Sequence, residues 1–424
     1  MTKEIIDNPW FEYPKFHWND KHAVIIGGGI AGCQMAWHLC QENWKVTLIE
    51  RHDQLATEAS GNIAGVISPK MTAKQSIGED FYTHCFQYTL CLLQTLEQQG
   101  KPVEYDNCGL LQLTHNKREE KRWAALKQRK LSTDFLQLLD EKQASKKAGI
   151  PLPYKASYFP QAAWIKPASF CRALSNHPNC KLIVESEALS LKKKQESWLV
   201  LSDSEKEIAE AEVIVICSGK DLTNLEQTQF LPIMPVAGQT TSAKASIESQ
   251  KLKTAVGHEG YLTPVIDGEH IFGATFERNE YNPQLTQDAD NKNIQQLEKH
   301  LPQFSATLSS FKSSHIAVRM TSPDRFPYAG ALPDCDFYKT NYHDLHQGKK
   351  HKNYPQAKYQ KGLFVLGGLG SRGLTTSGLC AKMLCNVITN KANKNSNALL
   401  EKTNLQRYCH PARFIIKQLK TNRN

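Results

Sequence analysis

Two glycine-rich segments lie near opposite ends of the 424-residue sequence, and glycine-rich backbone before a helix is suited to hold an anion. In the first segment, Gly27, Gly29 and Gly32 fit the spacing GxGxxG. Gly27 would make a tight turn, Gly29 would let the backbone approach a pyrophosphate, and Gly32 would let a helix pack closely on a strand. Glu50 would accept hydrogen bonds from the hydroxyls of an adenosine ribose. Together these residues predict a dinucleotide site.

The elements that must position these residues can be read around them. Residues 23–26 form a short apolar run typical of a buried strand, and an apolar-periodic helix follows until Asn43 can end it. Residues 45–49 then predict a second strand that delivers Glu50. A strand, a helix, a second strand and an acidic residue at this spacing fit NAD and FAD equally well.

The next segments favour FAD. The run ATEASGNIAGVISP at 56–69 places the small residues Ser60, Gly61 and Asn62 where a chain would pass a large flat ligand. A plain NAD dehydrogenase would continue there with another strand and helix. The apolar run AEVIVICSG at 211–219 predicts a strand that ends at Gly219, beside the adenosine half of the cofactor.

The second glycine-rich segment, VLGGLGSRGLTTSG at 365–378, follows an apolar strand at 363–366 and precedes an apolar-faced helix. It lacks the Gly-Lys-Ser/Thr ending of a loop that binds nucleotide triphosphates. A flavin that accepts a hydride gains negative charge at its N1/C2 carbonyl edge, which N–H groups at a helix N-terminus can stabilise. We expect Gly370, Arg372, Gly373 and Leu374 to lie against the flavin ring; the alternative is a turn that serves helix packing alone.

Composition excludes other classes of protein. With 40% hydrophobic and 22% charged residues, the chain is typical of a folded protein rather than a disordered one. The first residues lack the pattern of a signal peptide, and no apolar stretch is long enough to cross a bilayer, so we expect a cytoplasmic protein. The twelve cysteines show no CxxC pair and no clustered His/Cys spacing, so we expect no metal site.

The net charge of +10 is unevenly distributed. Three basic islands occupy residues 117–130, 348–361 and 401–424. They would form a footprint for a polyanion if the fold brought them to one face. The alternative is an ordinary solvated surface.

At the level of whole motifs the sequence resembles a known family. The order GGGIAG, IER, ASGN, WIKPASFCRAL, PVAGQT, GYLTP, VRMTSPDRFPYAG and GLGSRGL is similar to that of the D-amino-acid oxidase and glycine oxidase superfamily. ASGN, GYLTP and GLGSRGL further resemble the FAD-dependent oxidoreductase half of the bifunctional enzyme of tRNA 5-methylaminomethyl-2-thiouridine biosynthesis. The resemblance runs from residue 8 to residue 420.

The resemblance implies FAD and a reaction. The family's oxidoreductase acts on carboxymethylaminomethyl-uridine at the tRNA wobble position, an N-substituted glycine, and leaves aminomethyl-uridine and glyoxylate. Arg319 matches the arginine that pairs with the substrate carboxylate in glycine oxidases, although an interdomain ion pair is an alternative for it. Tyr261, in GYLTP, would line the same pocket or belong to the core.

The resemblance also implies tRNA as partner through the three basic islands. Only about twenty residues precede the first strand, so we expect a separate methyltransferase rather than an attached domain to act next. Two other functions stay open: a small-molecule amine oxidase of the glycine, D-amino-acid or sarcosine type, and a flavin-bearing RNA-binding protein without turnover.

The expected architecture is an α/β fold, α+β overall, with two interleaved domains of the D-amino-acid oxidase type. A Rossmann-like FAD domain would comprise residues 18–100, 160–222 and 325–400. A mostly antiparallel substrate domain would comprise residues 101–159 and 223–324, and residues 401–424 would form a basic C-terminal helix.

Overall fold

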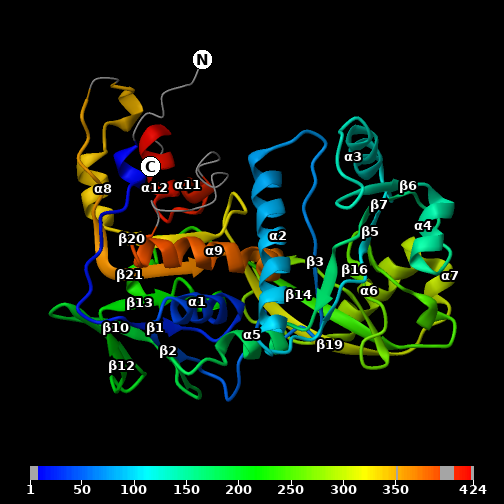
Figure 1. Ribbon diagram of the computed structural model, residues 1–424, viewed down its shortest axis with the longest axis horizontal. Helices are drawn as coiled ribbons and strands as arrows, with labels where there is room; N and C mark the ends of the chain where they lie inside the picture. The colour runs from blue at the N-terminus through cyan, green and yellow to red at the C-terminus, as the bar shows by residue number, and fades with distance from the viewer. Residues whose placement is uncertain (1–7, 350–351, 392–404, 422–424) are drawn as a thin grey trace.

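The computed structural model describes residues 8–349, 352–391 and 405–421. Two large sheets lie beside each other along the long axis of the molecule, with the six-stranded sheet at the left of Figure 1 and the nine-stranded sheet at the right. The expected α/β fold with one mostly parallel and one mostly antiparallel sheet is confirmed.

The six-stranded sheet contains the two strands expected around the first glycine-rich segment. Its spatial order is β20-β21-β13-β1-β2-β9, and only β20 runs antiparallel to its neighbour. The strands are β1 (His22–Ile26), β2 (Lys45–Ile49), β9 (Cys180–Ile183), β13 (Val213–Ile216), β20 (Tyr328–Pro333) and β21 (Tyr359–Gly367). Since five strands are parallel, their carboxyl ends meet at one edge of the sheet.

Each face of this sheet is covered by a different layer. Ala23 and Ile25 of β1 pack into a core with helices on one face, while Val24 and Ile26 pack into a second core on the other. The helices on the first face are α1 (Ile30–Gln41), α2 (Ile77–Gln98), α5 (Pro167–Ser175) and α9 (Gly373–Ile388). A three-stranded antiparallel sheet covers the other face: β10 (Ser190–Lys194), β11 (Ser197–Leu201) and β12 (Glu207–Ala211). The alternation of buried side chains along β1 therefore serves two layers.

The nine-stranded sheet is antiparallel except where β15 pairs with β5. Its strands are β5 (Leu110–Leu113), β6 (Gln137–Leu139), β7 (Ala156–Phe159), β14 (Met234–Lys244), β15 (Ala255–Gly257), β16 (Tyr261–Leu262), β17 (Glu269–Gly273), β18 (Glu277–Arg278) and β19 (Ser309–Thr321). The helices that accompany it are α3 (Lys117–Lys127), α4 (Glu141–Ala148), α6 (Gln287–His300) and α7 (Pro302–Ser305). Strand β19, which the sequence analysis did not identify, pairs with β14 along its whole length and carries Arg319.

Two details differ from expectation. The segment around Tyr105 lies within the range 101–159 expected for the mostly antiparallel substrate domain. It forms β4 (Tyr105–Asp106), which joins a small sheet with β3 (Gly65–Ile67) and β8 (Ala163–Ile165) instead of the nine-stranded sheet. The basic tail forms two short helices, α11 (Leu405–Cys409) and α12 (Arg413–Thr421), instead of one, because Pro411 follows the first helix and cannot continue it.

Parts of the expected domains and basic islands lie outside the described residues: 350–351, 392–404 and 422–424. The exact division of the chain into two domains remains a proposal. Within the described ranges, no helix is both long and apolar enough to cross a membrane.

Candidate cofactor and substrate site

A cavity of about 560 Å³ lies where the two sheets meet. Strands β1, β2, β13 and β21 all end at its wall, which is the position where open α/β sheets bind ligands. The cavity brings together most of the site residues expected from sequence: Gly27, Gly29, Glu50, Ser60, Asn62, Gly219, Tyr261, Arg319, Gly370, Arg372, Gly373 and Leu374. Residues more than 300 positions apart thus line one cavity.

Gly32 and Gly61, also expected at the site, do not line the cavity. A Cβ atom on Gly32 would lie 1.9 Å from the carbonyl oxygen of Gly27, so this glycine permits the close contact between α1 and the turn after β1. A Cβ on Gly61 would lie 2.5 Å from the carbonyl oxygen of Thr57. Both glycines therefore act on the shape of the backbone behind the wall.

The first glycine-rich turn is built as its sequence pattern requires. Gly27 has φ +106, a conformation that favours glycine, and a Cβ there would lie 2.6 Å from the carbonyl oxygen of Cys217. The side chain of Glu50 is buried, and its Oε2 accepts a hydrogen bond of 2.7 Å from the N–H of Gly28. Its Oε1 accepts one of 3.0 Å from the N–H of His52. The turn after β1 and the end of β2 are therefore held together by one carboxylate.

The segment with ASGN lies across the N-terminus of α1. The Ser60 hydroxyl accepts a hydrogen bond of 3.0 Å from the N–H of Ile30, the first residue of that helix. The side-chain amide of Asn62 donates to the carbonyl of Ala64 at 2.7 Å and to the hydroxyl of Tyr261 at 2.8 Å. These bonds tie the segment to both sheets.

Two hydroxyl groups of wall residues, Thr57 Oγ1 and Ser218 Oγ, have no hydrogen-bond partner among the described residues, but both oxygen atoms are buried and do not face the cavity. The fit to FAD rests instead on the glycine turn at Gly27, beside the N-terminus of α1, and on the carboxylate of Glu50 at the end of β2.

The second glycine-rich segment forms the opposite wall. Gly370 has φ +58, a short 3-10 turn covers Gly370–Arg372, and α9 begins at Gly373, so the N-terminus of a 16-residue helix borders the cavity. Arg372 donates a hydrogen bond of 3.1 Å to the carbonyl of Ser68. Burial lowers the pKa of this guanidinium, against the opposing influence of Tyr82.

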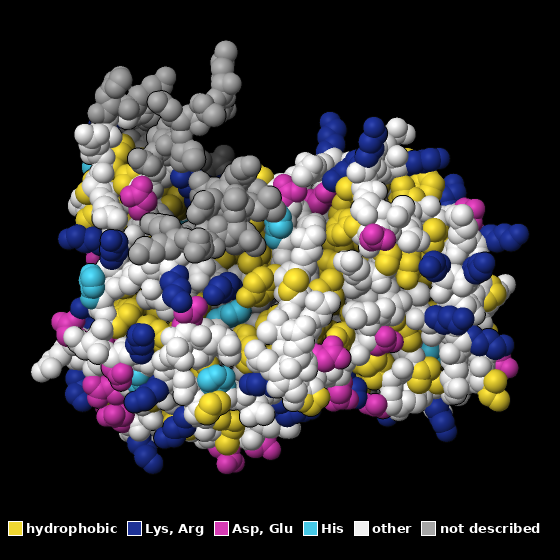
Figure 2. Space-filling view, in the orientation of Figure 1, with side chains coloured by type: hydrophobic (Ala, Val, Ile, Leu, Met, Phe, Trp, Pro, Cys, Tyr) yellow, Lys and Arg dark blue, Asp and Glu magenta, His cyan; other side chains and the backbone are white. Residues whose placement is uncertain are grey.

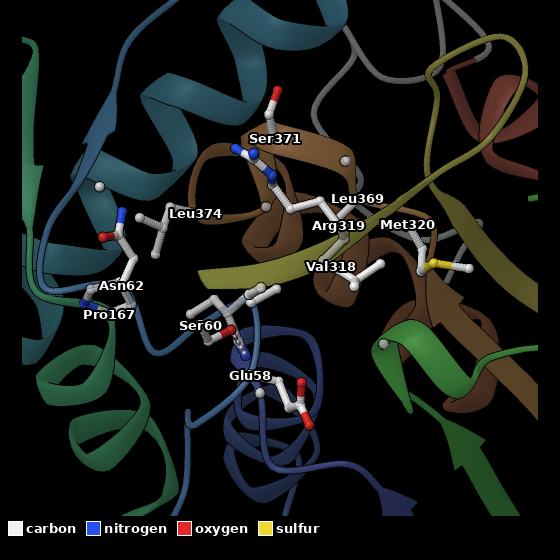
Figure 3. Close-up of a pocket in the computed structure, with 18 of the residues that line it drawn as sticks. Glu58, Ser60, Asn62, Pro167, Val318, Arg319, Met320, Leu369, Ser371 and Leu374 are labelled. Atoms are coloured by element: carbon white, nitrogen blue, oxygen red, sulfur yellow. Dashed lines mark hydrogen bonds between the residues drawn. The ribbon is translucent and has the colours of Figure 1, made fainter. Parts of the chain in front are cut away.

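Arg319 extends from β19 on the side of the loop that carries Leu369 and Ser371 (Figure 3). The only hydrogen bond that its guanidinium forms within the described residues is one of 3.3 Å to the carbonyl of Thr275, and it forms no ion pair with a carboxylate of those residues. Burial lowers the pKa of Arg319, and Tyr261 opposes this. A Cβ on Gly238 would lie 1.6 Å from Arg319 Nη2, so Gly238 leaves the space that the guanidinium occupies.

Sequence reasoning missed a charged network at the rim. Glu58 accepts a hydrogen bond of 2.6 Å from Arg51 and contacts Lys220 at 3.3 Å, and Arg51 also pairs with Asp221 at 2.7 Å. Burial raises the pKa of Glu58, but His52, Lys220 and Arg51 outweigh it and hold that pKa below its usual value. This charged network left only a weak signal in the sequence: Glu58 flanks the ASGN motif, and Lys220 and Asp221 follow Gly219.

The sequence profile of the family described as FAD dependent oxidoreductase matches residues 22–387. The chain belongs to this family. FAD is therefore its cofactor and oxidation–reduction is its chemistry, as the sequence analysis expected. Within the described ranges, no group of three or more His, Cys, Asp or Glu side chains is placed to hold a metal ion.

The oxidoreductase is similar to curated proteins named tRNA 5-methylaminomethyl-2-thiouridine biosynthesis bifunctional protein MnmC. It is 33% identical over 417 residues to the one from Pseudomonas fluorescens (strain Pf0-1) and 32% identical over 421 residues to the one from Chromobacterium violaceum. Each match covers 97% of this chain and 62% of the relative, so the chain spans less than two thirds of their length.

Solved structures show the same fold at low sequence identity. Glycine oxidase from Geobacillus kaustophilus matches with a TM-score of 0.70 at 17% identity, covering 91% of this chain and 98% of that one. Iminodiacetate oxidase from Chelativorans sp. BNC1 matches with a TM-score of 0.70 at 20% identity, covering 90% of this chain and 98% of that one. The expected D-amino-acid oxidase type of fold is thereby confirmed.

Proposed function

We propose that the oxidoreductase oxidises the carboxymethylaminomethyl group of a tRNA wobble uridine and leaves aminomethyl-uridine. The observation that carries this proposal is Arg319, a largely buried cation at the cavity that forms no ion pair with a described carboxylate. A buried guanidinium of this kind suits a substrate carboxylate, which it can bind through two parallel hydrogen bonds. The names of the relatives supply the tRNA substrate class.

The chain's own residues would orient the substrate for cleavage of one C–H bond, in the methylene beside the carboxylate. When bound, FAD accepts a hydride from the carbon beside an amine. Arg319, fixed by Thr275 and given space by Gly238, would hold the carboxylate so that the adjoining methylene faces the ring. Loss of the hydride from that methylene leaves an iminium ion in the substrate, and addition of water splits it into glyoxylate and the protonated primary amine.

Tyr261 would position rather than transfer a proton. Its hydroxyl donates a hydrogen bond of 3.1 Å to the carbonyl of Ala64 and accepts one from Asn62. Burial raises the pKa of Tyr261, although Asn62 and the charge of Arg319 lower it, so the hydroxyl stays protonated at neutral pH. Hydride loss from a neutral amine requires no protein base.

The cofactor contacts belong to the same proposal. Gly27 and Gly29 would hold the pyrophosphate, Glu50 the ribose, and Ser60, Asn62 and Gly219 the edges of the molecule. The backbone of residues 370–374 would lie against the flavin ring, while the Arg372 side chain points to the carbonyl of Ser68. The product named by the relatives carries an N-methyl group that the primary amine lacks, so a methyltransferase would use this product next.

The proposal is tested by anaerobic reduction of the bound flavin. The substrates are tRNA from a strain blocked after the carboxymethylaminomethyl step and, in separate samples, glycine and sarcosine. Bleaching by tRNA alone, with an apparent affinity that falls steeply as salt rises, is the expected result. Bleaching by the free amines alone would assign the protein to the small-molecule amine oxidases, and no bleaching with any substrate would leave RNA binding without turnover.

A further inference from the structure

A second, smaller cavity of about 50 Å³ adjoins the first. The two cavities share Ser68, Leu110, Gln112 and Arg372 in their walls. Residues 68–71 after β3 form one side of the small cavity, and α3, β5 and β7 contribute the rest. It is therefore reached from the same part of the molecule as the reaction site.

The wall of this cavity carries more positive than negative charge. Lys70, Arg122 and Arg372 line it, and Glu119 is the acid among its lining residues. Glu119 is already occupied, since its Oε2 accepts a bond of 2.6 Å from Arg122 and its Oε1 one of 3.4 Å from Arg118. Lys70 and Arg372 form no ion pair with any carboxylate of the described chain.

These two unpaired cations both lie against the ring of Tyr82. Lys70 Nζ lies 4.8 Å from the centre of the Tyr82 ring, and the Arg372 guanidinium carbon lies 5.7 Å from the same centre. Burial, followed by the charges of Arg372, Arg325 and Arg122, lowers the pKa of Lys70 to about 8. The charges of Arg372 and Lys70 repel each other, and both would stabilise an anion bound beside them.

The outer side of the cavity continues into a basic surface. Helix α3, which supplies Arg122, belongs to the basic island 117–130, and Lys and Arg side chains gather over it at the upper right of Figure 2. Arg118 on this helix is 80% exposed at its side chain. A polyanion such as RNA could contact this surface and the small cavity at the same time. A single small anion in the cavity would not contact the surface.

We propose that Lys70, Arg122 and Arg372 bind a phosphodiester group of the RNA next to the uridine that is oxidised. This inference rests on the proposed function. The substrate carboxylate is assigned to Arg319 in the large cavity, so a second anion site that shares a wall with that cavity fits a neighbouring group of the same substrate. The phosphate would then fix the register of the RNA while Arg319 fixes the reacting group.

The test compares Lys70→Gln, Lys70→Arg and wild type as FAD-loaded proteins. Anaerobic flavin reduction is followed with the modified tRNA and with the free nucleoside carboxymethylaminomethyl-uridine, which has no phosphate. Lys192→Gln on β10 is the matched control, because that lysine is exposed and lies on the three-stranded sheet at the far side of the molecule.

Lys70→Gln should raise the tRNA concentration for half-maximal reduction about tenfold and reduce the slope of log affinity against log salt by about one. In Lys70→Gln the preference for tRNA over the free nucleoside should therefore shrink about tenfold. Lys70→Arg should retain most of this preference, and Lys192→Gln should show the same preference as wild type. An unchanged preference in Lys70→Gln would overturn the inference.

Failure of the proposed function has a different signature. If modified tRNA does not reduce wild type, the proposed function is wrong, and the inference is then judged by binding of a labelled anticodon stem-loop. A roughly tenfold weaker complex with Lys70→Gln supports the phosphate site, and equal binding by both proteins refutes it.

Discussion

The side-chain amide of Asn62 donates a hydrogen bond of 2.8 Å to the hydroxyl of Tyr261, 199 positions later in the chain. Asn62 belongs to the segment that crosses the N-terminus of α1, and Tyr261 begins β16 of the antiparallel sheet. The carbonyl of Ala64 accepts one hydrogen bond from the same Asn62 amide and another from the Tyr261 hydroxyl. One small network thus fixes the antiparallel sheet relative to the cofactor segment.

Removing the Tyr261 hydroxyl should weaken this junction without changing proton transfer. Tyr261→Phe deletes two of the three hydrogen bonds and should lower the free energy of unfolding by about 1 kcal/mol, measured by urea denaturation of the FAD-loaded protein. Because the pKa of this hydroxyl is raised, the pH profiles of flavin reduction should superimpose between about pH 6 and 9. A profile that loses a limb in Tyr261→Phe would show that the hydroxyl does exchange a proton.

Arg319 should be needed for reaction with substrate and not for holding the flavin. Arg319→Lys keeps the charge but loses the planar fork, so its kcat/KM should fall about 10- to 100-fold. Arg319→Ala loses both the charge and the fork, so its kcat/KM should fall further. The absorption spectrum of bound flavin should stay as in wild type. Lys312→Gln, an exposed residue on the same strand, is the control. Loss of the flavin from Arg319→Ala would place this residue in cofactor binding instead.

Gly238 should act through Arg319. A methyl group at this position would overlap the guanidinium, with its Cβ only 1.6 Å from Nη2, so Gly238→Ala should reproduce the kinetic defect of the arginine variants. Combining it with Arg319→Ala should cost little more than Arg319→Ala alone, which a double-mutant cycle measures. Fully additive losses would mean that the two residues act independently.

Glu50 should set the affinity for FAD. Glu50→Gln replaces one of the two carboxylate oxygens, which accept the N–H groups of Gly28 and His52, with an amide that cannot accept. The dissociation constant for FAD should rise about tenfold, as expected for loss of one charge-assisted hydrogen bond. Fluorescence titration of the apoprotein measures it, with the exposed neighbour Asp53→Asn as control. Equal affinity in Glu50→Gln would contradict the assigned role.

An ion pair between α2 and the segment after α3 makes stability depend on pH. Buried Glu79 accepts hydrogen bonds from Arg129 and from both the N–H and hydroxyl of Thr72. Burial raises the pKa of Glu79, but these bonds outweigh it and hold that pKa below its usual value. The stabilisation is therefore present above the unfolded-state pKa of about 4.3 and is lost as pH falls through the lower folded-state pKa.

Glu79→Gln should lower the free energy of unfolding at pH 7 by about 1.5–3 kcal/mol. The difference from wild type should shrink as the pH falls below about 4, because the wild-type carboxylate then becomes protonated. Denaturation curves at several pH values measure it. The exposed Glu97→Gln on the same helix should change stability by less than about 0.5 kcal/mol. A difference that does not vary with pH would assign the effect to packing.

The sequence was most informative where function depends on neighbouring residues. The turn at Gly27, the close approach at Gly32 and the strand that ends before Glu50 are determined within about thirty residues, so spacing alone predicted them. The contact between Lys70, Tyr82 and Arg372 joins three distant segments, and nothing in their local sequences indicates it. Strand β19 was missed because its first half, Ser309 to Ser314, is polar except for Phe311 and lacks the apolar alternation of a half-buried strand.

The most direct test of the proposed reaction is the mass of the wobble nucleoside after one anaerobic turnover with modified tRNA, together with the amount of glyoxylate released. The expected products are one aminomethyl-uridine and one glyoxylate for each flavin reduced. Unchanged carboxymethylaminomethyl-uridine, in a sample where free glycine or sarcosine does bleach the flavin, would contradict the proposed reaction.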